Sequence, residues 1–98
     1  MPQTNPTTAQ DFLTKASELM AQRGQTYDQP TGERSMGSAI IAFNAITRQH
    51  LTEAEGWLLM QLLKDVRQWS RVEYHADSAE DGVTYSALKA ESLAKGAT

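Results

Sequence analysis

The residues of this sequence with the clearest chemical potential lie between Lys64 and Tyr85. Lys64, Arg67 and Arg71 follow one another at spacings of three and four residues, so a helix would carry them on one stripe. Asp81 and Tyr85 form a second pair, four residues apart. Cationic side chains can hold a phosphate or a nucleotide, and a tyrosine can add a hydrogen bond or a stacking face. The chemistry predicted for this stretch is therefore the binding of a small anion.

The helix that must position the basic residues has a clear start. Thr52 is placed as its N-cap and Glu55 follows three residues later, which is the pattern of a capping box. We expect this helix to continue through Arg71. Trp57 and Met60 widen an apolar stripe that is expected to face the core and to make the helix central in the fold. The stripe consists of Leu59, Leu62, Leu63 and Val66, with Trp69 or Ser70 as its last member.

The helix that carries Asp81 is predicted from the same logic. Ser78 and Asp81 fit a capping box, Asp77 is an alternative N-cap, and the helix is expected to end near Ala94. If the two helices form an antiparallel hairpin, the basic stripe, His75 and the second pair lie near one another. The positive N-terminus of the later helix would also favour an anion.

A structural role explains the same residues equally well. Asp81 could form an interhelical salt bridge with Lys64 or Arg67, and His75 could be an ordinary loop residue. The sequence leaves both interpretations open.

Two further helices are predicted earlier in the chain. The first runs from Thr7 or Thr8 to Arg23, with Gly24 as a left-handed cap. The second covers approximately residues 36–48, with Ser35 as its N-cap. We expect an all-α fold: a flexible leader at residues 1–7, then a single four-helix domain at residues 8–96.

The connection between the first two helices is longer than a helical bundle needs. The segment QTYDQPTGERS has eleven residues and is rich in turn formers. Tyr27 and Arg34 are candidates for one wall of a ligand pocket, together with Asp28 and Glu33. A solvated loop with Tyr27 packed at the edge of the core is the alternative.

Composition narrows the class of protein. The 98 residues carry a net charge of −3, which argues against binding of extended nucleic acid. The absence of cysteine fits a reducing cytoplasm, and neither a signal peptide nor a membrane span is predicted.

His75, Asp77 and Asp81 form only a weak pattern for a metal, so we expect no metal or cofactor. A core this small suggests a homo-oligomer.

Three motifs resemble a family of small helical phage and prophage domains of uncharacterised function. They are Arg-Gly-x-x-Tyr from Arg23, Lys-x-x-Arg from Lys64, and Asp-Ser-x-x-Asp-x-x-x-Tyr from Asp77. The resemblance covers approximately residues 23–91. It implies a viral protein that acts in the cytoplasm of a bacterial host.

The layout is also remotely similar to that of MazG-type all-α NTP pyrophosphohydrolases. Those enzymes hold Mg²⁺ with ExxE and ExxD motifs, whereas here Gly56 follows Glu53 at the third place and Leu58 follows Glu55. The resemblance therefore implies a nucleotide-sized pocket without the metal chemistry.

The leading hypothesis is a non-catalytic protein that binds a nucleotide or another small anion and sequesters a nucleotide signal of host defence. The residues expected to bind are Tyr27, Arg34, Lys64, Arg67, His75, Asp81 and Tyr85. One alternative is a divergent Mg²⁺-dependent pyrophosphohydrolase that uses Asp65, Asp77 and Asp81. Another is an inhibitor that binds a host enzyme through an exposed apolar patch.

Overall fold

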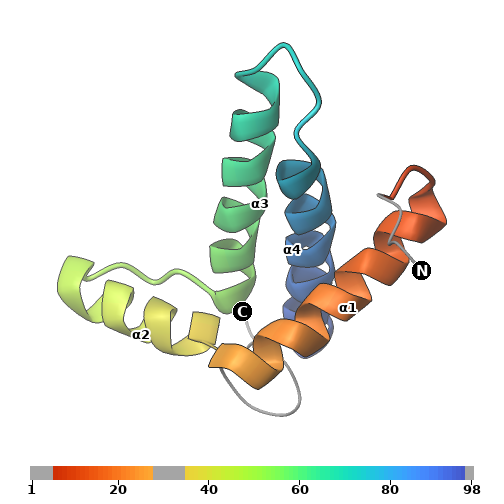
Figure 1. Cartoon of the computed structure of the whole chain (residues 1–98). Helices are drawn as coiled ribbons and strands as arrows, with labels where there is room; N and C mark the ends of the chain where they lie inside the picture. Colours follow the sequence, from red (N-terminus) through yellow and green to blue (C-terminus); the bar gives the residue numbers. More distant parts are fainter. Residues whose placement is uncertain (1–5, 28–34, 97–98) are drawn as a thin grey trace.

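The computed structural model describes residues 6–27 and 35–96, and for residues 24–27 it describes the backbone alone. Four helices make up most of these ranges (Figure 1): α1 (Ala9–Tyr27), α2 (Ser35–Thr47), α3 (Glu53–Trp69) and α4 (Ala76–Ala94). The same ranges contain no β-strand. None of the helices in them is both long and apolar enough to span a membrane. The predicted all-α class with four helices is confirmed.

α3 begins with the predicted capping box. The Oγ1 of Thr52 accepts a hydrogen bond from the backbone N–H of Glu55 at 3.1 Å, and the Oε1 of Glu55 accepts one from the backbone N–H of Thr52 at 2.8 Å. Two backbone N–H groups at the start of the helix thus find partners in side chains. The helix ends at Trp69 rather than at Arg71.

α4 begins earlier than the sequence predicts. The capping box at Ser78 and Asp81 and the alternative cap at Asp77 are both wrong, because the N-cap residue is His75. The physical reason lies on α3. The Oε1 of Gln68 accepts the backbone N–H of His75 at 2.8 Å, while its Nε2 donates to a carbonyl of the turn at 3.1 Å. A contact between helices, which no local pattern encodes, therefore sets the start of α4.

The other helix ends also differ in part from the prediction. α1 does not stop at Arg23 with Gly24 as its cap but continues to Tyr27. A glycine inside a helix costs only about 1 kcal/mol relative to alanine, so it need not end one. Ser35 is the first residue of α2 rather than its N-cap. Arg48 has a positive φ of 61°, so α2 ends just before it.

The helices form an open arrangement around one hairpin (Figure 1). α3 and α4 pack side by side as the predicted antiparallel pair, and α1 crosses α4. α2 packs on α3 and projects away from the hairpin. The hairpin is thus the centre of the molecule, and α1 and α2 are attached to different helices of it.

The core lies between α3 and α4. Trp57, Tyr85 and Leu88 are its buried residues, and the rings of Trp57 and Tyr85 stack with their centroids 5.7 Å apart. The prediction of Trp57 as a core residue is confirmed. Three methionines pack against this cluster: Met20, Met36 and Met60.

α2 approaches α3 closely at Gly56. A Cβ atom at this position would lie 2.9 Å from the Cδ1 of Ile40 and closer still to the Sδ of Met36. Real Cβ atoms do not tolerate such distances, so the missing side chain of Gly56 allows the two helices to cross here. The crossing fixes only the first turns of α2, and α2 contains no buried residue.

The apolar stripe of α3 does not face the core. Leu62, Val66 and Trp69 are 49%, 62% and 86% exposed, and Leu59 and Leu63 are exposed as well. α3 turns a different side towards α4, formed by Trp57, Gln61, Lys64 and Gln68. The predicted burial of the stripe is therefore wrong. The aromatic stack and the ion pairs with α4 hold the opposite face of the helix inward.

Candidate anion-binding site

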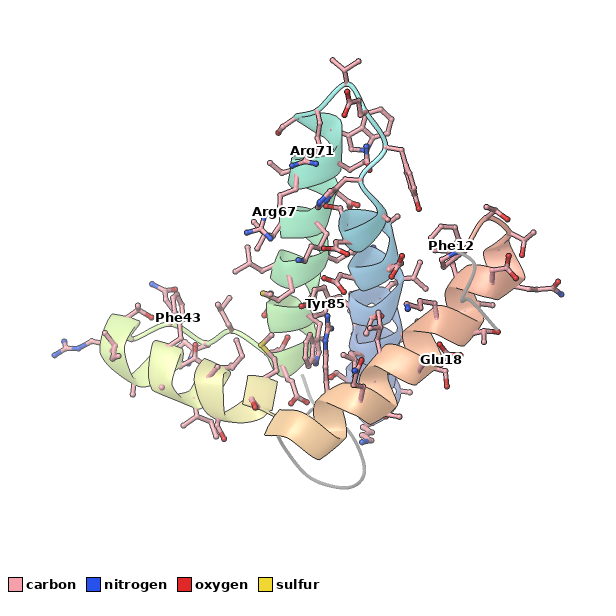
Figure 2. The ribbon with its side chains drawn as sticks, viewed as in Figure 1. Phe12, Glu18, Phe43, Arg67, Arg71 and Tyr85 are labelled. Atoms are coloured by element: carbon pink, nitrogen blue, oxygen red, sulfur yellow. The ribbon has the colours of Figure 1, made fainter. Side chains whose placement is uncertain are left out.

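The α3–α4 hairpin brings two of the predicted site residues into contact. The Nζ of Lys64 lies 3.1 Å from the Oδ2 of Asp81, and the two side chains are only 13% and 14% exposed. Of the two partners predicted for Asp81 on α3, the structure pairs it with Lys64. Arg67 is exposed and points away from α4 (Figure 2). The basic stripe thus divides between two sides of α3.

A third residue joins this pair from α1. The Nη2 of Arg23 donates to the Oδ1 of Asp81 at 2.7 Å. Its guanidinium carbon lies 5.7 Å from the centroid of the Tyr85 ring, within the range of a cation–π interaction. We call Arg23, Lys64, Asp81 and Tyr85 the Asp81 cluster. At this cluster α1, α3 and α4 meet.

The sequence analysis did not assign Arg23 to the site. A signal is present, since Arg23 opens the Arg-Gly-x-x-Tyr motif, of which the sequence-based prediction includes only Tyr27. The spacing within α1 does not reveal how that helix crosses α4. The contact between Arg23 and Asp81 joins residues 58 positions apart and depends on that crossing.

Tyr85 forms a packed wall of the cluster. The residue is 7% exposed, its ring stacks on Trp57, and the guanidinium group of Arg23 lies over it. Both contacts are between side chains of different helices. The ring of Tyr85 therefore helps to hold α1 and α3 on α4.

Gln61 adds a buried acceptor to the same side of α3. It lies one turn after Trp57 and about one turn before Lys64, so the three side chains share a face of the helix. Its Oε1 is buried and has no hydrogen-bond partner among the described residues. Buried amide oxygens normally have a partner, and the described residues supply none for this atom.

His75 lies apart from the cluster. Its Nδ1 is 2.7 Å from the Oγ of Ser78, and its backbone N–H is held by Gln68. Asp81 follows it six positions later, which is about 9 Å along the helix axis. These contacts tie His75 to the turn of the hairpin.

The loop residues of the predicted site cannot be placed. Tyr27 is the last residue of α1, but its side chain and the whole of Arg34 lie outside the described residues, as do Asp28 and Glu33. Within the described ranges, no group of three or more His, Asp or Glu side chains could hold a metal ion.

A groove of about 480 Å³ lies elsewhere, at the other end of the hairpin. Its lining is mostly apolar and comes from the start of α3 and the end of α4: Thr52, Ala54, Glu55, Leu58, Lys89 and Leu93. None of the predicted site residues lines it.

The two cations at Asp81 can hold a negatively charged group. The two carboxylate oxygens of Asp81 each take one cation, Arg23 on Oδ1 and Lys64 on Oδ2. The partial burial of all three side chains strengthens these contacts relative to ion pairs in open water.

Comparison of the chain with protein-family models, with curated proteins and with solved structures finds no match.

Proposed function

We propose that this chain binds a small anionic ligand, a nucleotide by preference, at the Asp81 cluster and does not convert it chemically. The observation that supports the proposal is the convergence of Arg23 and Lys64, from two different helices, on the oxygens of one partly buried carboxylate. A phosphate group presents similar oxygens to the same two cations. In the free protein, Asp81 takes the place of the ligand's anionic group.

A nucleotide fits the surroundings better than inorganic phosphate does. The buried Oε1 of Gln61 is an acceptor without a partner among the described residues. The amino and imino groups of a nucleobase are donors, and inorganic phosphate at neutral pH offers far less in this respect. The proposal therefore rests on Arg23, Lys64 and Asp81 for the phosphate and on Gln61 for the base. Arg67 and His75 are no longer part of it.

Thermal unfolding with added ligands tests the proposal. Inorganic phosphate, pyrophosphate and a panel of mono- and dinucleotides are added in turn, and a ligand that binds the folded state raises the Tm. We expect the largest rise from a nucleotide. Lys64→Met keeps most of the aliphatic stem but removes the charge, and should abolish that rise. Lys95→Met is the matched control, because Lys95 is exposed and pairs with Glu91 at the end of α4.

Asp81→Asn gives the sharper result, because it separates binding from structure. This change removes the carboxylate that competes with a ligand for Arg23 and Lys64. We expect it to lower the Tm of the free protein and to increase the rise caused by the nucleotide. If no phosphorylated compound raises the Tm of either the original protein or Asp81→Asn, the proposal is wrong and the cluster is structural.

A further inference from the structure

We propose that the exposed apolar face of α3, together with α2, is the contact surface of a homodimer. Four residues of α3, Leu59, Leu62, Val66 and Trp69, follow at spacings of three, four and three residues. A stripe whose spacings alternate between three and four residues is the pattern by which one helix packs along another. Leu63 of the same stripe and its neighbour Leu58 are exposed as well.

α2 requires the same kind of cover. Its thirteen residues, SMGSAIIAFNAIT, contain no charged side chain, and none of them is buried. Ile41 and Ile46 are 72% and 83% exposed, and Phe43 is exposed too. A helix that is apolar around its whole girth is normally buried in a folded protein. Within the described residues, α2 packs only on α3.

The exposed area matches what a dimer of this size would bury. The accessible surface is 7005 Å², whereas a compact monomer of this mass exposes about 5,500 Å². The Cα radius of gyration is 14.6 Å, against about 12.6 Å for a compact domain of this length. The excess surface, about 1,500 Å², lies within the roughly 1,000–2,500 Å² that one subunit of an obligate homodimer buries.

The small core identifies the occupant as a second copy. Among the described residues, Trp57, Tyr85 and Leu88 form the buried hydrophobic cluster, and most of the large apolar side chains of α2 and α3 are exposed. A fold with so little buried apolar area needs a partner in order to be stable. Such a partner must be present wherever the chain is made, and a second copy always is. Because the Asp81 cluster lies on the opposite side of α3, this inference does not depend on the proposed function.

Sedimentation velocity and thermal unfolding of the whole chain test the dimer. We expect a species of twice the 10.8 kDa chain mass and a Tm that rises with protein concentration. Leu62→Glu/Val66→Glu places two charges in the stripe and should abolish the dimer. Ala87→Glu/Ala90→Glu adds the same charges to exposed positions of α4 and should leave the dimer intact.

Single cysteines keep the test decisive if the charged variant fails to fold. The chain contains no cysteine, so a cysteine introduced at Leu62 or Val66 can form a disulfide only with its counterpart in another copy. Cysteines pair when their Cα atoms come within about 7 Å. We expect mild oxidation to crosslink at least one of these two variants, and not Ala87→Cys. A 10.8 kDa monomer whose Tm is independent of concentration would overturn the proposal. Binding of such a monomer to lipid vesicles would overturn it as well.

Discussion

The two long faces of α3 use opposite chemistry. The face towards α4 carries Trp57, Gln61 and Lys64, and it is held by a stack and an ion pair with groups on α4. The outer face carries the apolar stripe and is exposed. In most small helical proteins the more apolar face is the buried one. The reversal indicates that specific contacts close the hairpin, while most of the apolar area of α3 stays exposed.

The two tryptophans of α3 give the largest test of this difference, because the same substitution falls on each face. Trp57 is 4% exposed and Trp69 is 86% exposed. Trp57→Ala should lower the free energy of unfolding by about 3–5 kcal/mol, as for other large core deletions. Urea denaturation followed by circular dichroism measures this loss, and an unchanged midpoint would refute the assignment of Trp57 to the core.

Trp69→Ala should act on association instead. The side chain makes few contacts within its own protomer, so its removal is expected to raise the dissociation constant of the proposed dimer by about tenfold or more, as for interface tryptophans in general. Sedimentation velocity over a range of concentrations measures this change. A dissociation constant equal to that of the original protein would exclude Trp69 from the interface.

The ion pairs of the inner face give the next largest effect. Asp81→Ala leaves Arg23 and Lys64 without their shared carboxylate in a partly buried position, and it should cost about 1.5–3 kcal/mol of stability. A double-mutant cycle between Lys64 and Asp81 should show coupling, whereas a cycle between Arg67 and Asp81 should show none. Coupling of equal size in both cycles would mean that α3 is rotated relative to the arrangement described.

The capping box of α3 affects both faces, because it fixes where the helix begins. Thr52→Ala removes the Oγ1 that accepts the backbone N–H of Glu55 and should lower stability by about 1 kcal/mol. Thr47→Ala is a suitable control, since its hydroxyl bonds only to a carbonyl one turn earlier in α2. Equal losses from the two changes would argue against a special role for the cap.

The smallest effect concerns the start of α1. Hydrogen bonds from the backbone N–H groups of Thr8 and Thr7 lower the pKa of Asp11 below its ordinary value of 3.8. A lowered pKa means that the folded state favours the charged carboxylate. Its contribution to stability is therefore complete above the ordinary pKa and is lost as the pH falls through the lower, folded value. An NMR titration of the Asp11 carboxyl should give a midpoint below 3.8, and Asp11→Asn should remove this part of the acid dependence.

Much of the fold could be predicted because its signals are local. Periodic apolar residues and the box at Thr52 and Glu55 depend on neighbours within a turn or two, and they correctly predict four helices and the start of α3. The prediction of the start of α4 failed because that start depends on a hydrogen bond that the backbone N–H of His75 donates to Gln68, on another helix. Local patterns cannot contain that information.

The site could be predicted only as far as the hairpin determines it. An antiparallel pairing of α3 and α4 is enough to bring Lys64 to Asp81. The addition of Arg23 requires the crossing of α1 over α4. The inward face of α3 was predicted wrongly because the apolar pattern does not contain the stack with Tyr85 and the ion pair with Asp81, which turn the other face of the helix towards α4.

The packing of α1 on α4 affects how the protein folds during its synthesis. Of the four described helices, α1 leaves the ribosome before the others, and the helix on which it packs leaves after them. During synthesis, at about 5–20 residues per second, α1 must wait for several seconds before its docking surface exists. The bond between Arg23 and Asp81 then closes a loop of 58 positions. The synthesis of α4, rather than the formation of any earlier helix, is thus the event that allows α1 to dock.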